Sequence, residues 1–514
     1  MTDRPRLHPR PTRRAFLSGA SSLALAGPAI ARLPGGGRGG RVDRPNVLFI
    51  TADQHRFDVA GFAGNAHAHT PNLDRLAGEG TRITDVYCQS PLCVPARQTL
   101  VTGRYAHDHG SFANWLAFAP EEWTVARALA AAGYDTAFFG KTHADTAGFR
   151  TVVDRNEMVR AFRADHADAV VPGKIHRRGP QARKSFKLHQ MNPGTLPPGD
   201  DSVSVFHMDE AVVGRTAAFL ARRDREAPFF IWASLLAPHP PFYPPEEWLA
   251  RFRDARLPFH APLSEEAAAR LPARERQHRA ELGFEAVTPE AMLGITRSYY
   301  AAVAWADHNV GRLLSALEEA GCAEDTLVVY TSDHGEMLGE HGLMFKQSFY
   351  EGAVRVPCLV RYPGAVTEGD VLGGVLQRVD LVATLLDFTG LEAEDGGDLP
   401  GVSFAGAMSA GSTPGAGRAL SELAPRSQLP DEVGATGELE GARLQQMVRV
   451  GRHKYMRYGA DDERLFDLAE DPGETRNLAG DPKHASTLAR LRSELAALTP
   501  KTVTVRGPDA PRGR

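Results

Sequence analysis

A cysteine followed two and four residues later by proline and arginine is the segment of this sequence best suited to chemistry. In Cys93-Val94-Pro95-Ala96-Arg97, the proline can occupy the first turn of a helix, where its missing N–H is not needed. Cys93 would then lie at the helix N-terminus, which attracts anions, and Arg97 could grip an oxyanion through two N–H groups. An isolated motif of five residues would be better explained by a buried structural cysteine, so its surroundings must decide.

Polar and ionisable side chains follow four segments that we expect to be strands. The expected strands cover 46–51, 136–139, 229–236 and 326–331. The side chains just after them are Asp53 and Gln54, Lys141 and His143, His239, and Asp333 and His334. In open α/β sheets, ligands bind at the carboxyl ends of the strands. These strand ends therefore predict one convergent site rather than four unrelated surface loops.

Expected helices alternate with these strands, which is typical of an α/β domain with a large, mainly parallel sheet between helices. They cover 70–79, 123–132, 205–223 and 291–319. We expect a catalytic domain over 45–395 and a linker rich in Gly, Ala, Ser and Asp over 396–417. A small C-terminal α+β domain should occupy 418–505, with strands near 445–450 and 453–458 and a helix near 484–497.

Composition excludes several classes of protein. The chain has 514 residues, is 42% hydrophobic and carries a formal net charge of −4, so it can bury a large core and gives no sign of binding nucleic acid or a membrane surface. Its four cysteines, at 88, 93, 322 and 358, lack CxxC spacing and predict neither a zinc cage nor a disulfide framework. One disulfide between two of these cysteines is compatible with the sequence. The sequence does not indicate an oligomeric state.

The first 44 residues have the order of regions typical of an export signal. Basic residues run from Arg4 to Arg14, and 12–17 resembles a twin-arginine signal. A moderately apolar stretch follows and ends in the small-x-small sequence Ala29-Ile30-Ala31. We expect a signal peptide over 1–31, a glycine-rich spacer over 32–44, and a periplasmic or secreted protein. The alternative is a disordered basic tail.

The motif at Cys93 resembles the C-x-P-x-R modification signal of the sulfatase family, with Thr102-Gly103-Arg104 trailing it as in that family. In sulfatases a maturation enzyme oxidises this cysteine to formylglycine. Further stretches match in order over most of the chain: 70–76, 140–143, 238–242, 331–336, 345–351, 355–357, 465–468 and 471–478. The resemblance implies an alkaline phosphatase-like fold and a sulfuric ester hydrolase.

The resemblance also implies a role for each matched residue. The metal ligands would be Asp53, Gln54, Asp333 and His334, with residue 93 completing the shell. Substrate charge would be neutralised by Arg97, Lys141, His239 and Lys346. One hydroxyl of the hydrated formylglycine would attack sulfur, and His239 or Lys346 would protonate the leaving oxygen. His143 would then help to deprotonate the second hydroxyl, so that sulfate is expelled.

The sequence is compatible with more than one metal and more than one substrate. Oxygen-rich ligands suit Ca²⁺, but Gln54 and His334 depart from the commonest sulfatase set and leave Mg²⁺, Mn²⁺ and Zn²⁺ open. The expected substrate is a sulfated carbohydrate or an aryl or alkyl sulfate. The basic stretch 174–187 fits a sulfated glycan and a solvated loop equally well.

The sequence is also compatible with two alternative functions. Phosphonate monoester and phosphodiester hydrolases share the fold, the formylglycine and often the Asp-Gln and Asp-His ligand pairs. We favour a sulfatase because 338–343 followed by Phe345-Lys346 resembles the choline-sulfatase and glycan-sulfatase type. A sulfated-glycan-binding protein without turnover would be expected to lack the cysteine or a metal ligand, and this chain has them all.

Overall fold

A computed structural model defines the fold. It describes residues 44–114, 123–154, 157–158, 207–391, 399–411, 417–424, 437–459 and 461–505. The expected signal peptide, most of the spacer and the basic stretch 174–187 lie outside these residues. Among the helices that are described, none is both long and apolar enough to span a membrane.

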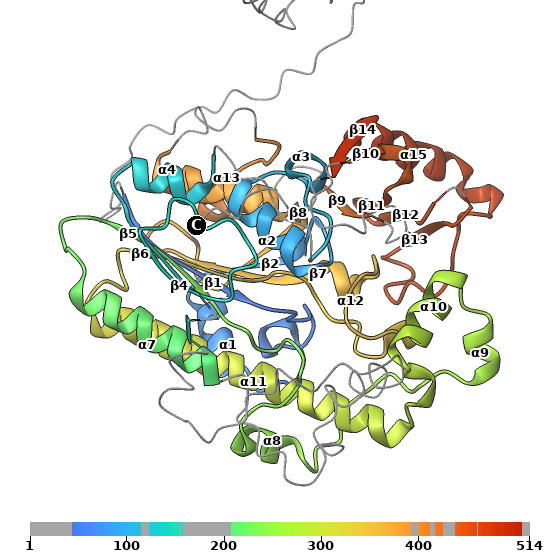
Figure 1. Ribbon diagram of the computed structural model, residues 1–514, viewed down its shortest axis with the longest axis horizontal. Coiled ribbons are helices and arrows are strands. Elements are labelled where there is room, and N and C mark those ends of the chain that lie inside the picture. Colours follow the sequence, from blue (N-terminus) through green and yellow to red (C-terminus); the bar gives the residue numbers. More distant parts are fainter. Residues whose placement is uncertain are drawn as a thin grey trace, which may run out of the picture. The chain divides into compact units, whose positions relative to one another are not determined.

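An eight-stranded sheet runs through the larger part of the protein (Figure 1). In spatial order its strands are β4 (Thr151–Asp154), β3 (Asp135–Gly140), β5 (Phe229–Ser234), β1 (Asn46–Ala52), β6 (Thr326–Ser332), β7 (Arg355–Arg361), β2 (Thr81–Tyr87) and β8 (Asp370–Gln377). Only the pairs that β7 makes with β6 and β2 are antiparallel. The mainly parallel α/β sheet that the sequence predicts is confirmed.

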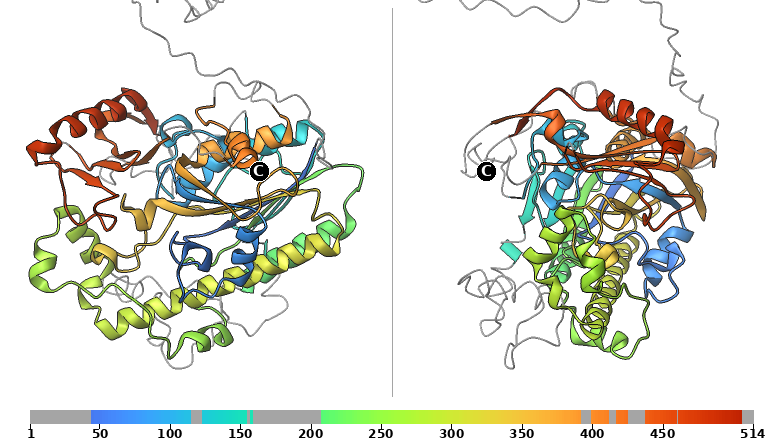
Figure 2. Two further views of the ribbon diagram at one scale, coloured as in Figure 1. Left: turned by 180° about the vertical axis from the view of Figure 1, so that it is seen from behind. Right: turned by 90° about the vertical axis from the view of Figure 1, so that its right-hand side faces the viewer.

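Helices cover both faces of this sheet (Figures 1 and 2). One face carries α1 (Pro71–Gly78), α7 (His207–Arg222) and α11 (Pro289–Glu319), and the other carries α2 (Cys93–Thr102), α4 (Val125–Ala131) and α13 (Arg378–Thr389). Successive side chains of β1 point to opposite faces. Leu48 and Ile50 pack in the core beneath α11, whereas Val47 and Phe49 pack in the core beneath α4 and α13. Both faces are therefore dry, which explains the unbroken apolar run in the sequence.

A smaller antiparallel sheet forms the C-terminal part. Its order is β13 (Glu463–Asp467), β12 (His453–Arg457), β11 (Gln445–Val450) and β9 (Arg418–Leu423). Helix α15 (Ala485–Leu498) packs on it through Leu488, Leu491 and Leu495. Strands β10 (Gly437–Glu440) and β14 (Thr502–Val505) form a separate pair. The other α-helices within the described residues are α3 (Ala106–His109), α8 (Glu246–Phe252), α9 (Glu265–Ala269), α10 (Ala273–Leu282), α12 (Glu351–Val354) and α14 (Ala405–Ala410). Of these, α14 lies within the segment expected to be a linker.

A buried ion cluster joins the small sheet to the large one. Lys454 of β12 is fully buried, and its Nζ lies 2.9 Å from carboxylate oxygens of both Glu351 and Glu474. Tyr87, at the end of β2, donates its hydroxyl to Glu351 at 2.8 Å. A buried charge needs such partners, because an unpaired one is strongly destabilising. Glu351, which follows Lys346 closely in sequence, therefore serves the contact between the two sheets.

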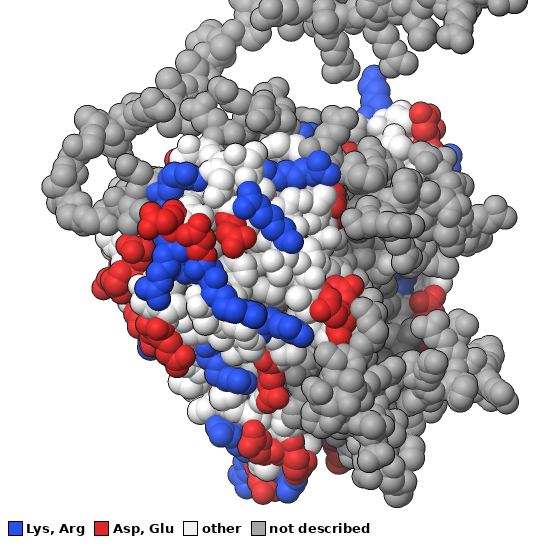
Figure 3. All heavy atoms as spheres, turned by 60° about the vertical axis from the view of Figure 1, so that its left-hand side comes forward, with Lys and Arg blue, Asp and Glu red and all other residues white. Residues whose placement is uncertain are grey.

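Charged side chains on the face shown in Figure 3 are mixed by sign. Among the described residues drawn there, basic and acidic groups lie next to one another, with wide uncharged areas between them. This arrangement gives that face no extended field of one sign.

Candidate active site

The carboxyl ends of the central strands meet the N-terminus of α2 at one buried cluster. Asp53 follows β1, Asp333 and His334 follow β6, and Cys93 begins α2. Each of these four residues places one potential ligand atom within 4.8 Å of the others, which is a spacing suited to a metal ion. All four are buried. The convergence of strand ends that the sequence predicts is therefore present.

Cys93 lies at the centre of the cluster. Its sulfur is 3.2 Å from Nε2 of His334, 3.2 Å from Nζ of Lys346 and 3.7 Å from Nζ of Lys141. Burial would raise the pKa of the thiol, but the positive charges of Lys141 and Lys346, together with the nearby His334 ring, outweigh it and hold the pKa well below its ordinary value. The site thus stabilises negative charge on whatever group occupies position 93.

Arg97 is turned toward the carboxylates rather than toward an open space. Its Nε donates to Oδ2 of Asp333 at 2.8 Å and its Nη2 to Oδ2 of Asp53 at 3.2 Å. Its Nη1 donates to the Lys141 carbonyl at 2.9 Å and to the Ser234 hydroxyl at 2.6 Å. This placement differs from the expected grip on a substrate oxyanion, because the donors already hold the two carboxylates in place.

The donor atoms around Cys93 suit a divalent cation. The Nδ1 of His334 lies 3.0 Å from the Gly335 carbonyl and can only donate to it, which leaves the Nε2 lone pair facing the site. Asp53 stays ionised: burial and the Cys93 sulfur would raise its pKa, but Lys141, His239 and Arg97 together hold it below the ordinary value. Two carboxylates and one imidazole nitrogen therefore converge with their lone pairs available.

Gln54 adds an amide oxygen to this set. Its side-chain Oε1 accepts from Nζ of Lys346 at 2.6 Å, and its Nε2 donates to Glu336. The backbone N–H of Gln54 donates to Oδ1 of Asp333 at 3.0 Å, and its carbonyl accepts from the Tyr299 hydroxyl at 2.7 Å. Four contacts thus fix a residue whose φ is +71°, a conformation that glutamine seldom adopts.

Two lysines flank the sulfur on different elements. Lys141 follows β3, is buried and forms an ion pair with Asp53. Lys346 lies in the segment between β6 and α12 and bridges Gln54 and Cys93. Burial would lower the pKa of Lys346, but the negative charges at Cys93, Asp53 and Asp333 raise it above its ordinary value. Both ammonium groups are therefore placed to bind an anion that reaches position 93.

Two histidines line the same space. His239 is half-buried, and its Nδ1 lies 2.6 Å from the Pro240 carbonyl. Burial, together with the positive charge of Lys141, lowers the pKa of His239 to about 4, so its ring is neutral at pH 7. His143 is exposed and hydrogen-bonds the Cys93 sulfur. The structure thus brings together all ten residues that the sequence analysis singled out.

Sequence reasoning missed three residues that hold this cluster in place. Glu336 bonds to the Gln54 amide, Ser234 accepts from Arg97, and Tyr299 donates to the Gln54 carbonyl. Glu336 lies inside the matched stretch 331–336 and Ser234 lies near the end of the expected strand 229–236, so the only sequence signal at either position is its place in that segment. Tyr299 lies within the long helix α11 and has no local signal in the sequence.

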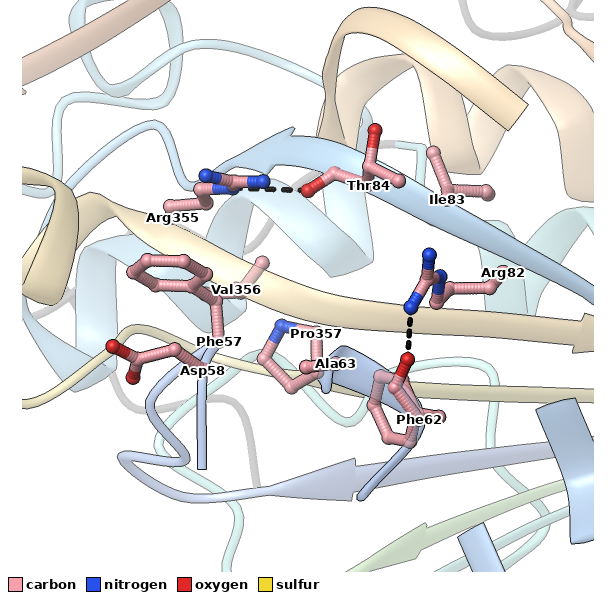
Figure 4. Close-up of a pocket in the computed structure, with 10 residues that line it drawn as sticks. All are labelled: Phe57, Asp58, Phe62, Ala63, Arg82, Ile83, Thr84, Arg355, Val356 and Pro357. Carbon is pink, nitrogen blue, oxygen red and sulfur yellow. Dashed lines mark hydrogen bonds between the residues drawn. The ribbon is translucent and has the colours of Figure 1, made fainter. Parts of the chain in front are cut away.

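A hollow of about 130 Å³, separate from the cluster around Cys93, lies beside the loop that follows β1. Phe57, Phe62 and Pro357 are among its apolar lining residues, and Arg82 and Arg355 project from neighbouring strands (Figure 4). Arg82 donates to the Phe62 carbonyl and Arg355 to the Thr84 carbonyl. None of the ten site residues lines this hollow.

Comparison with known proteins agrees with this geometry. The family model described as Sulfatase matches residues 45–391. An arylsulfatase of Clostridium perfringens is 27% identical, with 88% of this chain and 94% of the relative covered. An N-acetylglucosamine-6-O-sulfatase of Bacteroides thetaiotaomicron is 27% identical, over 87% and 85%. A phosphonate monoester hydrolase of Agrobacterium radiobacter has a similar crystal structure, with a TM-score of 0.71, 26% identity and coverage of 88% and 95%.

The fold and the site define a hydrolase of the alkaline phosphatase-like class. The match over 45–391 further shows that this chain belongs to the sulfatase family and is a sulfuric ester hydrolase.

Proposed function

We propose that this enzyme hydrolyses a sulfate monoester of a carbohydrate or of an aryl or alkyl alcohol, with residue 93 present as formylglycine and one divalent metal beside it. The observation that carries the proposal is the position of Cys93, which begins α2 with Lys141, Lys346 and His334 within 3.7 Å of its sulfur. Two ammonium groups around a buried nucleophile suit attack on an anionic ester. As formylglycine, residue 93 would supply a hydroxyl nucleophile that cysteine lacks.

The residues that would hold the metal are Asp53, Gln54, Asp333 and His334, together with residue 93. Bound there, a divalent cation supplies Lewis acidity and neutralises negative charge. Two carboxylates and an amide oxygen suit Ca²⁺, and the imidazole of His334 also suits Mn²⁺ or Zn²⁺. The metal in the native enzyme can be identified by elemental analysis of the purified protein.

The remaining residues bind the substrate and move protons. Lys141 and Lys346 neutralise the sulfate oxygens, and both are tied to the cluster by carboxylate or amide contacts. Lys346 holds a proton at neutral pH and is placed to give it to the leaving oxygen, whereas the His239 ring is neutral and serves as a hydrogen-bond partner. His143, at the exposed side of the site, accepts a proton from residue 93.

Hydrolysis of a phosphonate monoester or phosphodiester is the second candidate function. It is favoured by the similarity to the phosphonate monoester hydrolase structure and by the Gln54 and His334 ligands. Sulfate monoesters and phosphodiesters both carry one negative charge, so the two lysines do not separate them.

The experiment is the ratio of kcat/KM for 4-nitrophenyl sulfate and for phenyl phosphonate monoester and diaryl phosphodiester substrates, with the same preparation of matured enzyme. We expect the sulfate to be preferred. A preference for either phosphorus substrate would overturn the sulfatase assignment.

We further propose that the enzyme is exported through a twin-arginine signal within residues 1–31, which supports a periplasmic or secreted location. N-terminal sequencing of the exported protein should find a chain that begins close to residue 32. Recovery of an uncleaved chain from the cytoplasm alone would contradict export.

A further inference from the structure

We infer that Glu336 is a positioning residue that fixes which end of the Gln54 amide faces the metal site. The inference rests on the proposed metal centre, to which Gln54 would contribute its side-chain oxygen. Glu336 is fully buried, and one of its oxygens accepts a hydrogen bond from Gln54 Nε2. It belongs to neither the proposed ligands nor the groups that meet the substrate.

Lys346 independently shows which end of the Gln54 side chain is oxygen. Its Nζ lies 2.6 Å from one terminal atom of that amide. An ammonium group can donate but cannot accept, so the atom it meets must be Oε1. The other terminal atom is then the NH₂ group, which points at the Glu336 carboxylate. The amide is thus held at both ends, and its oxygen lies beside Lys346, which also contacts the Cys93 sulfur.

The Glu336 carboxylate is itself held firmly. Its second oxygen accepts the backbone N–H of Leu338 at 2.9 Å and that of Phe345 at 2.5 Å. Gln54, Leu338 and Phe345 have φ values of +71°, +46° and +66°, in the left-handed region that residues with side chains seldom occupy. Such conformations persist where the surroundings over-determine them. One carboxylate therefore bonds to three strained residues, and one of these directly precedes Lys346.

At position 336 a carboxylate can select one orientation of the Gln54 amide, whereas an amide of the same size cannot. A glutamine side chain has two orientations of similar shape, and only one of them offers oxygen to a cation. Both oxygens of Glu336 face N–H donors, the backbone of Leu338 and Phe345 on one side and the Gln54 amide on the other, so the carboxylate acts as an acceptor and selects the orientation in which Gln54 donates. In a Glu336→Gln variant the new amide can keep both backbone hydrogen bonds through its oxygen. It would, however, place NH₂ against NH₂ and favour rotation of Gln54 away from the metal.

The experiment is calorimetric titration of Ca²⁺ into the full chain after treatment with a chelator. Four proteins are compared: wild type, Glu336→Gln, the control Glu340→Gln, and the double variant Gln54→Glu with Glu336→Gln. Glu340 lies on the same segment and pairs with Arg56 at 2.7 Å, so its substitution tests the loop alone. We expect Glu336→Gln to weaken the Kd by about 10- to 100-fold, as is usual for outer partners of metal ligands, and Glu340→Gln to leave it unchanged.

The double variant is the discriminating case, because it reverses the polarity of one hydrogen bond. The amide introduced at position 336 would donate to the carboxylate introduced at position 54. The other oxygen of that carboxylate would face Lys346 and the metal, so affinity should return to the wild-type level or exceed it.

Two results would overturn the inference. One is an equal Kd for wild type and Glu336→Gln, and the other is a double variant that binds as weakly as Glu336→Gln or does not fold. If wild type itself binds no divalent metal, the proposed metal centre fails as well, and this outcome is distinct from a failure confined to the variants.

Discussion

Substitution of Arg97 by lysine should loosen the two carboxylates of the site while leaving the positive charge in place. Arg97 donates four hydrogen bonds from three nitrogens that point in different directions. A lysine has one nitrogen and cannot reach Asp53, Asp333 and the Lys141 carbonyl together. At about 1 kcal/mol for each hydrogen bond, the loss of three lowers the free energy of unfolding by about 3 kcal/mol.

Thermal unfolding in the presence of a chelator measures this loss. The entropy of unfolding is about 2.1 cal/mol/K per residue, or about 1 kcal/mol/K for 514 residues, so Tm should fall by about 3 °C. The Kd for Ca²⁺ should also rise by about 10- to 100-fold, because the carboxylates lose their fixed orientation.

Arg464→Lys is a matched control for this experiment. Arg464 is also a buried arginine; it donates to Tyr350 at 2.8 Å, to Asp462 at 2.6 Å and to Glu275 at 3.0 Å, and none of these partners is one of the ten site residues. Its replacement should lower Tm by a similar amount without changing the affinity for Ca²⁺. If Arg97→Lys keeps both the wild-type Tm and the wild-type Kd, Arg97 does not organise the carboxylates and the reasoning is refuted.

Three further predictions concern catalysis, pH and metal. Lys346→Met should reduce kcat for an alkyl or sugar sulfate by about 10²- to 10⁴-fold, because the leaving oxygen loses its proton donor. The loss should be smaller for 4-nitrophenyl sulfate, because a nitrophenolate leaves without a proton. Equal losses for the two kinds of substrate would show that Lys346 does not protonate the leaving oxygen. Burial raises the pKa of Asp307 from 3.8 to about 6, so the folded protein gives up an extra proton as the pH rises. Between pH 4 and pH 7, wild type should therefore lose about 2 kcal/mol of unfolding free energy relative to Asp307→Asn, and equal pH profiles in denaturant titrations would contradict this. Chelation should abolish turnover and lower Tm in wild type, whereas Asp333→Ala should unfold at one Tm with and without the chelator.

Much of the fold could be predicted because its elements carry local signals. The apolar run 46–51 forms β1, and the expected helix 291–319 forms α11 with a difference of two residues at its start. Strands β2 and β8 were not anticipated. They pair with each other although nearly 300 residues separate them, and β7 enters the sheet antiparallel between β6 and β2. Pairing of this kind depends on the whole chain, which a local pattern does not record.

In the candidate site, too, features with a local sequence signal could be predicted and features that depend on distant contacts could not. Residues at strand ends were found because parallel strands place their carboxyl ends together. The partners of Arg97 and the bond between Gln54 and Glu336 could not be found, because they depend on side-chain directions and, for the amide, on a contact across 282 positions. Arg97 is an example. Its spacing from Cys93 predicts that it binds the substrate, whereas in the structure its guanidinium group donates hydrogen bonds to the carboxylates of Asp53 and Asp333.

Mass spectrometry of the peptide that contains residue 93, taken from active enzyme made in its native host, shows whether the nucleophile is formylglycine. We expect the residue mass of an aldehyde in place of the Cys93 thiol, in a fraction that rises and falls with sulfatase activity between preparations. A Cys93→Ala protein should fold and have no turnover. Full activity in enzyme whose Cys93 is entirely unmodified, or retained turnover in the alanine variant, would show that formylglycine is not the nucleophile.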